Sequence, residues 1–355
     1  MSESPVSAIA EAVAAETAPS APTAVQIAGL THRYPGADRD ALVNLNFAVR
    51  PGEAFALLGP NGGGKTTTFR VLATMLEPSG SAAAEVSVFG HSVFGDPAAA
   101  RRELGVVFQS PSLDLKLTAR ENLACHARLY GLPRRDAAPR IDEALARFDL
   151  VERMHERVEA FSGGMRRKLE IAKALLHRPR LLLMDEPATG LDPAARRELW
   201  EHLRSLREQS DLTVAWTTHL MDEAEHADRL AVLRRGNLLT VQTPAELKAS
   251  LGGHTVIVEP GDTADADWMR DRVDAALGPL APGREPVVAQ NAVRFEHPDG
   301  PAVVAQTAAL FPDRLRRVSV GQPTLEDAYL RLTGDRSDPA EPATSGPVSS
   351  SSDAN

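Results

Sequence analysis

The sequence predicts an α/β fold, in which buried strands form a sheet that helices cover. Short apolar runs of strand length alternate along the chain with stretches that have a helical spacing of apolar residues. Two runs, Ala54–Leu58 and residues 181–184, are almost continuously apolar, which is typical of parallel strands buried on both faces. Residues 213–217 have the same character, and we expect them in the same sheet.

Length and composition limit the class of protein. At about 150 residues per domain, the 355 residues correspond to about two globular domains. The formal net charge of −9 argues against a nucleic-acid-binding protein, because the surface as a whole repels a polyanion. The single cysteine, Cys125, excludes an internal disulfide framework and a multi-cysteine zinc site. It lies in a helical apolar pattern, and we expect its thiol in the core.

The composition divides the chain into four parts. Residues 1–24 and 334–355 are rich in Ala, Pro and Ser, and we expect disordered tails there. We expect the main α/β domain in residues 25–245, with a helical subdomain at about 110–180. The sequence contains no apolar run of membrane-spanning length, and no basic residue precedes Arg33, so neither a membrane span nor a secretory signal is expected.

Helical patterns dominate the predicted subdomain. Thr118 and Glu121 have the spacing of a capping box at the start of a helix. A second helix is expected over residues 139–150. A third is expected to begin after Ser162 and to end before Pro179.

Residues 250–333 are expected to form a small, separate α+β domain. We predict strands at residues 256–258, 287–289 and 292–295, and helices near residues 266–277 and 324–332. These residues include no catalytic cluster, so we expect an accessory domain.

A glycine-rich loop follows the first apolar strand. Residues 59–66, Gly-Pro-Asn-Gly-Gly-Gly-Lys-Thr, match the P-loop pattern G-x-x-x-x-G-K-[ST]. The backbone N–H groups of such a loop cradle phosphates, and the following helix directs its positive N-terminus at the anion. We expect Lys65 to reach the β and γ phosphates and the Thr66 hydroxyl to bind Mg²⁺. A chance match is disfavoured, because the chain has only five lysines.

Two acids end the second apolar strand. Asp185 and Glu186 follow residues 181–184, at the end of the strand where ligands bind in open α/β sheets. We expect Asp185 to hold Mg²⁺ and Glu186 to orient or deprotonate an attacking water. The alternative is a core strand that happens to meet an acidic loop, and the P-loop makes this alternative the weaker one.

Four further motifs occur in a fixed order around these two. Gln109 follows an apolar run, residues 161–165 read Phe-Ser-Gly-Gly-Met, and Asp192 and His219 come after the two acids. In this order the motifs resemble the ATPase subunit of an ABC transporter, over residues 25 to about 245. The resemblance implies a P-loop NTPase fold of the ABC type that binds ATP and Mg²⁺ and hydrolyses the ATP.

The resemblance also implies partners and a location. Two copies of such a subunit face each other head to tail and sandwich ATP between them. They act with a polytopic membrane permease that is a separate chain, on the cytoplasmic side of the membrane. The resemblance implies no nucleic-acid partner.

Roles for individual residues follow from the resemblance as well. The expected catalytic residues are Glu186, His219, Gln109 and Lys65, and the expected metal ligands are Thr66, Gln109 and Asp185. Tyr34 resembles the aromatic residue that stacks on adenine. The expected ATP-binding residues are Tyr34, Gly59, Pro60, Asn61, Gly62, Gly63, Gly64, Lys65, Thr66, Thr67, Ser162, Gly163, Gly164 and Asp192. Of these, Ser162, Gly163, Gly164 and Asp192 are expected to act across the dimer interface.

Residues 161–165, which we call the signature segment, depart from the usual family pattern at both ends. Phe161 and Met165 stand where Leu and Gln are usual. The Met165 side chain donates no hydrogen bond, but the serine and two glycines that contact nucleotide are present. We therefore still expect ATP hydrolysis.

The branch of the family is indicated by three segments. Residues 162–167, 190–193 and 324–334 are similar to the daunorubicin-resistance type of exporter ATPase. We expect the motor of an exporter of drugs, lipids or glycans. One alternative is an importer ATPase, which the C-terminal segment disfavours. The other is a soluble ABC ATPase that acts on DNA or ribosomes. The 120 residues between Lys65 and Asp185 leave no room for the long coiled coil of DNA-repair members, and the single cassette disfavours a translation-type member.

Two other polar groups are expected to carry no chemistry. His219, Glu223 and His226 are expected on one helix face, but they lack the zincin spacing H-E-x-x-H and a third ligand. Residues 166–168 form a run of three charges, Arg166, Arg167 and Lys168, which we expect on a solvated helix face.

Overall fold

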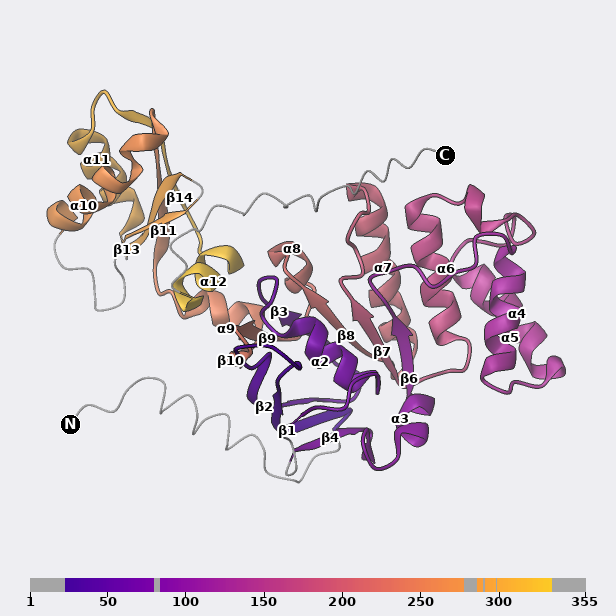
Figure 1. The fold of residues 1–355 in the computed structure, drawn as a ribbon. Coiled ribbons are helices and arrows are strands. Elements are labelled where there is room, and N and C mark those ends of the chain that lie inside the picture. The colour runs from indigo at the N-terminus through magenta and orange to yellow at the C-terminus, as the bar shows by residue number, and fades with distance from the viewer. Residues whose placement is uncertain (1–22, 80–83, 278–285, 290, 298, 334–355) are drawn as a thin grey trace, which may run out of the picture. The chain divides into compact units, whose positions relative to one another are not determined.

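The computed structural model describes residues 23–79, 84–277, 286–289, 291–297 and 299–333 (Figure 1). The contacts divide the chain into two compact units, Met1–Pro244 and Ala245–Asn355. Apart from residues 23 and 24, the expected tails at residues 1–24 and 334–355 lie outside the described residues. Within the described ranges, no helix has the length and apolar character that a membrane crossing needs.

The first unit is built on a six-stranded sheet in the order β10-β9-β3-β8-β7-β6. Its strands are β3 (Ala54–Leu58), β6 (Leu104–Val107), β7 (Leu181–Asp185), β8 (Thr213–Thr218), β9 (Arg229–Arg234) and β10 (Asn237–Gln242). β10 pairs antiparallel with β9, and all other neighbours in this sheet are parallel. Every residue of β3, β7 and β8 is buried, as expected for the interior of an α/β fold. The predicted fold class is confirmed.

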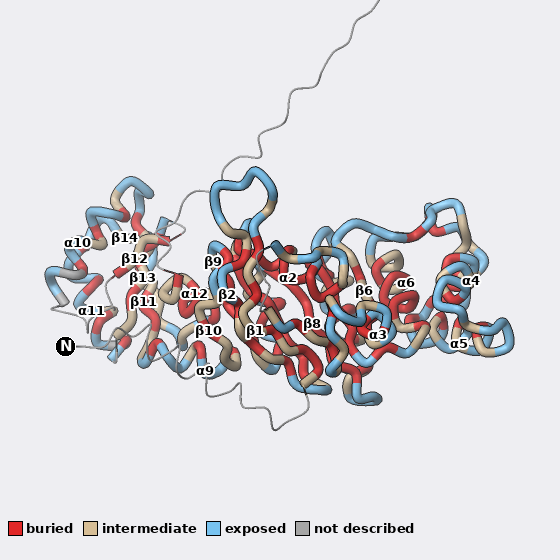
Figure 2. The backbone as a smooth tube through the Cα atoms, turned by 60° about the horizontal axis from the view of Figure 1, so that its bottom comes forward, coloured by how far each residue is buried: buried red, intermediate tan, exposed pale blue. Residues whose placement is uncertain are grey.

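A smaller antiparallel sheet, in the order β2-β1-β4-β5, shares its core with the first. Its strands are β1 (Val25–His32), β2 (Leu42–Val49), β4 (Glu85–Val88) and β5 (His91–Ser92). Phe47 of β2 stacks on Phe55 of β3, with ring centroids 5.5 Å apart. Buried residues of both sheets are marked in Figure 2. This packing joins the smaller sheet to β3, the strand from whose carboxyl end the P-loop leaves.

The helices of the first unit include a group that packs together beyond β6 (Figure 1). All the helices described in the first unit are α2 (Lys65–Leu72), α3 (Pro97–Glu103), α4 (Ala119–Leu129), α5 (Arg134–Arg147), the 3₁₀ turn η1 (Val158–Ala160), α6 (Gly163–Leu175), α7 (Pro193–Gln209) and α8 (Met221–Ala224). We call α4, α5 and α6 the helical group. The capping box of Thr118 and Glu121 is present at α4. The start predicted at Pro139 was wrong, because α5 begins at Arg134 and contains that proline.

Cys125 is exposed, so the expectation of a core thiol was wrong. Helix α4 buries Asn122, Leu123 and Ala127. At about 100° per residue, position 125 is rotated by about 200° from position 123 and faces away from that side. The apolar run in the sequence did not reveal which helix face packs inward.

The charge run at the start of α6 is not solvated, contrary to expectation. Arg167 is buried, and Arg166 donates to the backbone oxygens of Val158 and Glu159. Lys168 pairs with Glu198 of α7 at 2.6 Å. The three residues point to different sides of α6, and each contacts another part of the first unit.

The second unit is a four-stranded antiparallel sheet with helices, in the order β12-β13-β11-β14. Its elements are α9 (Pro244–Ala249), which starts at the last residue of the first unit, β11 (His254–Pro260), η2 (Thr263–Asp265), α10 (Ala266–Leu277), β12 (Val287–Ala289), β13 (Ala292–His297), α11 (Gly300–Leu310), β14 (Leu315–Gly321) and α12 (Leu325–Thr333). Val256, Val293, Phe295 and Phe311 belong to its separate apolar core. α11 and β14 were not predicted, whereas the other strands and α10 lie close to the expected positions.

The turn between β9 and β10 supports the P-loop from behind. Gly236 has a φ of 80°, and its N–H donates to the carbonyl of Gly63 at 3.0 Å. Its carbonyl accepts from the N–H of Val43 at 2.8 Å. A Cβ at this position would lie 2.7 Å from the carbonyl oxygen of Ala41. Only glycine fits, and the turn joins the P-loop to the start of β2.

We predict that Gly236→Ala destabilises the protein more than the matched control Gly90→Ala. Gly90 also has a φ of 80°, in the turn between β4 and β5, but a Cβ added there would have no atom within 4 Å. The left-handed backbone alone should cost about 1–2 kcal/mol in both variants. Urea unfolding should show an additional loss for Gly236→Ala. Equal losses would show that the close approach at Gly236 is relieved at no cost.

Candidate functional site

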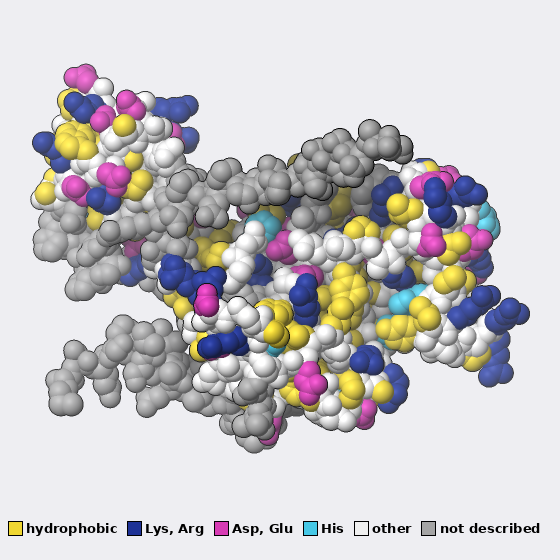
Figure 3. All heavy atoms as spheres, in the orientation of Figure 1, with side chains coloured by type: hydrophobic (Ala, Val, Ile, Leu, Met, Phe, Trp, Pro, Cys, Tyr) yellow, Lys and Arg dark blue, Asp and Glu magenta, His cyan; other side chains and the backbone are white. Residues whose placement is uncertain are grey.

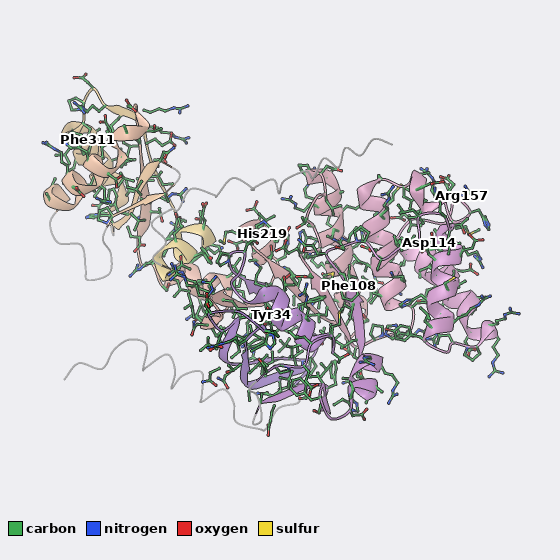
Figure 4. All side chains as sticks on the ribbon, in the orientation of Figure 1. Tyr34, Phe108, Asp114, Arg157, His219 and Phe311 are labelled. Carbon is green, nitrogen blue, oxygen red and sulfur yellow. The ribbon has the colours of Figure 1, made fainter. Side chains whose placement is uncertain are left out.

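The candidate site lies where four parallel strands end. The P-loop follows β3, His219 follows β8, Glu186 follows β7, and Gln109 follows β6. Because β3, β8, β7 and β6 are parallel neighbours, their carboxyl ends meet at one edge of the sheet. Figure 4 labels His219 at this edge together with Tyr34, which precedes β2, and Phe108, which precedes Gln109.

The P-loop conformation depends on Gly64, which is the N-cap of α2. Its φ of 108° lies in a region that other residues rarely adopt. A Cβ there would come within 2.9 Å of the Ala41 carbonyl oxygen and the Leu42 side chain. Thr66 lies in the first turn of α2, whose N–H groups are free of partners within the helix and suit an anion.

Lys65 is buried at the start of α2. Its Nζ donates to the backbone oxygens of Gly59 at 2.8 Å and Pro60 at 3.0 Å. It also lies 3.8 Å from Oε1 of Glu186. Burial lowers the pKa of Lys65, and the negative charges of Glu186 and Asp185 oppose that shift. The ammonium is thus held inside the loop and is available to a phosphate there.

Side chains from several segments of the site lie close to the carboxylate of Glu186. Its Oε2 accepts from Nε2 of Gln109 at 3.2 Å and from the hydroxyl of Thr189 at 3.3 Å. Its Oε1 lies 3.3 Å from Nδ1 of His219. The residue has a φ of 44°, an unusual value outside glycine, and its N–H donates to the hydroxyl of Thr217 at 3.0 Å. The strained backbone directs the carboxylate to the site.

Asp185 is a buried carboxylate at the end of β7. The Thr217 hydroxyl donates to its Oδ1. Burial raises the pKa of Asp185, and the hydrogen bond from Thr217 opposes this shift. A cation beside the carboxylate would favour its charged form. Asp185, Thr66 and Gln109 supply the oxygen ligands that Mg²⁺ prefers, so these residues fit that ion.

Tyr34 lies beside the P-loop helix and is half-buried. Its hydroxyl is 3.3 Å from the hydroxyl of Thr67 in α2. Its ring meets His32 edge to face, with ring centroids 4.5 Å apart. This contact leaves the ring beside the loop, in keeping with the predicted contact to a base.

The signature segment and Asp192 lie next to each other. Ser162 caps α6 by accepting from the N–H of Met165, so Met165 contributes through its backbone. Asp192 caps α7 and accepts from the N–H groups of Ala194 and Ala195, which lower its pKa, the Ala195 bond most. A Cβ on Gly164 would lie 3.1 Å from Cβ of Ala195.

Both capping residues are exposed, and in the described part of the chain neither side chain forms a hydrogen bond to the P-loop. The structure therefore brings together Lys65, Glu186, Gln109 and His219, and separately brings together Ser162, Gly163, Gly164 and Asp192.

Sequence reasoning missed two threonines of the site, Thr189 and Thr217. Thr217 holds both acids, but it is distant from them in sequence, and only the pairing of β7 with β8 reveals it. The predicted helix face of His219, Glu223 and His226 was wrong, because α8 begins after His219 and ends before His226. Glu223 accepts from the hydroxyl of Thr218, and His226 stacks on Trp200.

Relatives of the chain are named as ATP-binding proteins of resistance and export. The family model described as "ABC transporter" matches residues 42–189. The daunorubicin resistance ATP-binding protein DrrA3 of Streptomyces coeruleorubidus is 38% identical, over 89% of this chain and 97% of that protein. The Nod factor export ATP-binding protein I of Neorhizobium galegae is 38% identical, over 89% and 86%. The linearmycin resistance ATP-binding protein LnrL of Bacillus subtilis is 33% identical, over 82% and 92%.

A solved structure supports the fold. The chain is similar to cbiO1 of Clostridium perfringens, part of the ABC transporter complex cbiONQ, with a TM-score of 0.59 and 26% identity. The match covers 64% of this chain and 91% of that one. Together with the relatives' identity and coverage, it leads to one conclusion. The chain belongs to the ABC transporter family, as an ATP-hydrolysing motor subunit of the type that these exporter and resistance proteins represent.

Proposed function

We propose that the chain binds ATP with Mg²⁺ at the carboxyl edge of its sheet and that Glu186 is the catalytic carboxylate, so that hydrolysis drives export through a separate permease. The observation that carries this proposal is the convergence of Lys65, Gln109 and His219 on the two Glu186 oxygens. Three separate segments place positive or donor groups around one buried acid. Such an arrangement suits a group that orients and deprotonates water.

Each residue has a distinct part in the proposal. Lys65 contacts the β and γ phosphates, and His219 contacts the γ phosphate. Thr66, Asp185 and Gln109 hold Mg²⁺, whose charge offsets that of the phosphates. Tyr34 stacks on adenine, and the loop residues Gly59, Pro60, Asn61, Gly62, Gly63, Gly64 and Thr67 surround the phosphates.

A second copy of the chain completes the site in this proposal. Ser162, Gly163, Gly164 and Asp192 serve the nucleotide of the opposite subunit. The exposure of Ser162, Gly163 and Asp192 supports this assignment, because exposed groups are free to meet a second copy. The N-terminus of α6 offers backbone N–H donors to a γ phosphate across the interface.

The permease is proposed to bind the helical group, on the inner face of the membrane. Large apolar side chains are exposed on or beside these helices, namely Leu115, Leu129, Tyr130 and Val151. Figure 3 shows basic side chains on the same part of the surface. Residues 25–245 are proposed as the ATP-binding domain and residues 250–333 as an accessory domain that tunes dimer contacts or docking.

The proposed cargo is a drug, lipid or glycan. The relatives are named for daunorubicin resistance, linearmycin resistance and Nod factor export. In this arrangement the permease contacts the cargo, and co-purification of the chain with a polytopic membrane protein tests the assignment.

We predict that Lys65→Ala abolishes most ATPase activity. The ammonium offsets charge that develops on the phosphates, so its loss should lower the rate by about 10²-fold or more. Steady-state hydrolysis with Mg²⁺ is the measurement. Lys116→Ala is the control, since Lys116 is a well exposed lysine in a surface ion pair with Glu159. Hydrolysis by Lys65→Ala at the control's rate would contradict the proposed site.

The two acids should differ when each is replaced by its amide. Glu186→Gln should lower single-turnover hydrolysis by about 10² to 10⁴-fold and spare ATP affinity, because the lost group acts on water. Asp185→Asn should weaken Mg²⁺-dependent ATP binding as well, because it removes a metal ligand. Turnover of Glu186→Gln within a few-fold of the parent would show that Glu186 is not the catalytic carboxylate.

ATP should drive dimerisation when hydrolysis is blocked. In Glu186→Gln at saturating Mg²⁺-ATP, light scattering should report twice the monomer mass, because two nucleotides lie in the interface. Adding Ser162→Arg should return the protein to a monomer with ATP still bound, since the exposed cap contacts the opposite nucleotide. A monomeric Glu186→Gln under these conditions would contradict the sandwich.

A further inference from the structure

Three buried charged residues line one face of α6, and the mechanism above uses none of them. Arg167, Glu170 and Lys173 follow one another at intervals of three residues and are all buried. Arg167 donates to Oε2 of Glu170 at 3.0 Å. Burial lowers the pKa of Lys173, and the charge of Glu170 opposes this shift. Buried charges are a poor source of stability compared with apolar packing, so their presence calls for another explanation.

All three side chains hold the loop that carries Gln109. Arg167 donates to the carbonyl oxygen of Phe108 at 2.9 Å. Oε1 of Glu170 accepts from the N–H of Ser112 at 2.7 Å. Lys173 donates to the carbonyl oxygen of Ser112 at 3.0 Å and to its hydroxyl at 2.5 Å. The loop is thus fixed at residues 108 and 112, on both sides of Gln109.

Gln109 itself projects from this clamped loop to the site. Its Nε2 donates to Oε2 of Glu186 at 3.2 Å, and the residue is exposed. Between Phe108 and Ser112, this is the side chain that reaches the catalytic carboxylate. The position of its amide therefore depends on where α6 holds the loop.

We infer that Arg167, Glu170 and Lys173 are positioning residues, which fix Gln109 on Glu186 and so set the rate of hydrolysis. The inference rests on the proposed roles of Gln109 and Glu186. Glu170 is its centre, because its carboxylate contacts both Arg167 and Ser112. A displacement of about 1 Å at a reacting group costs up to about 10²-fold in rate.

The decisive variant is Glu170→Gln, which keeps the shape and removes the charge. In full-length protein, kcat for ATP should fall by about 10-fold or more, and KM should change much less than kcat, because the P-loop and the proposed metal ligand Asp185 are untouched. Lys173→Met removes the hydrogen bonds from Lys173 to Ser112 and should also lower kcat more than it changes KM. It provides a second route if Glu170→Gln does not fold.

The matched control is Glu53→Gln. Glu53 is buried, pairs with Arg229 at 3.3 Å and accepts from the N–H of Arg50 at 2.7 Å, but it precedes β3 at the opposite edge of the sheet. This variant should lower the melting temperature with little change in kcat. A merely structural role for Glu170 predicts the same behaviour in both variants, and that result would overturn the inference.

A double-mutant cycle with Gln109→Ala tests whether the clamp acts through Gln109. The double variant Gln109→Ala with Glu170→Gln should be no slower than Gln109→Ala alone, because the positioned group is gone. Effects that multiply would overturn the inference. If Gln109→Ala has a low kcat and Glu170→Gln has the kcat of the parent, the positioning role of Arg167, Glu170 and Lys173 is overturned and the proposed role of Gln109 stands. A fully active Gln109→Ala would overturn the proposed role of Gln109, and the clamp with it.

Discussion

The alignment of four parallel strands is the constraint on which the rest of the site depends. Side chains that follow β3, β8, β7 and β6 can meet only because these strands are parallel neighbours that end at one edge. The meeting point is Glu186, whose backbone is held at a φ of 44° by the neighbouring strand. Without that support the strained backbone would relax, and the contacts of Lys65 and Gln109 with one carboxylate would be lost.

The parts of this arrangement that are local in sequence could be predicted. The P-loop lies within eight consecutive residues, and the two acids directly follow the apolar strand that buries them. The strands Ala54–Leu58 and Leu181–Asp185 are buried on both faces, so a continuous apolar run sufficed to find them. The capping box at Thr118 is equally local, because its three-residue spacing satisfies the first N–H groups of a helix.

The parts that depend on distant partners could not be predicted. Arg167 looked like a solvated charge because its partner, the carbonyl of Phe108, is 59 residues away. The prediction of a core thiol at Cys125 is wrong because an apolar run does not say which face of α4 packs inward. Helix α11 is apolar on most sides and lacks the periodic pattern that identifies a helix. Thr217 supports both acids only through the pairing of two strands.

Helix α6 belongs to the signature segment at its N-terminus and holds the loop of Gln109 along its buried side. Its exposed N-terminus, capped by Ser162, is the part proposed to meet the nucleotide of the opposite subunit. Its buried side holds the loop of Gln109, which contacts Glu186 in its own subunit. A helix is stiff over thirteen residues, so a shift at one end moves the other. In the proposed dimer, one helix would therefore contact the nucleotide of the opposite subunit at its N-terminus and position Gln109 in its own subunit along its buried side.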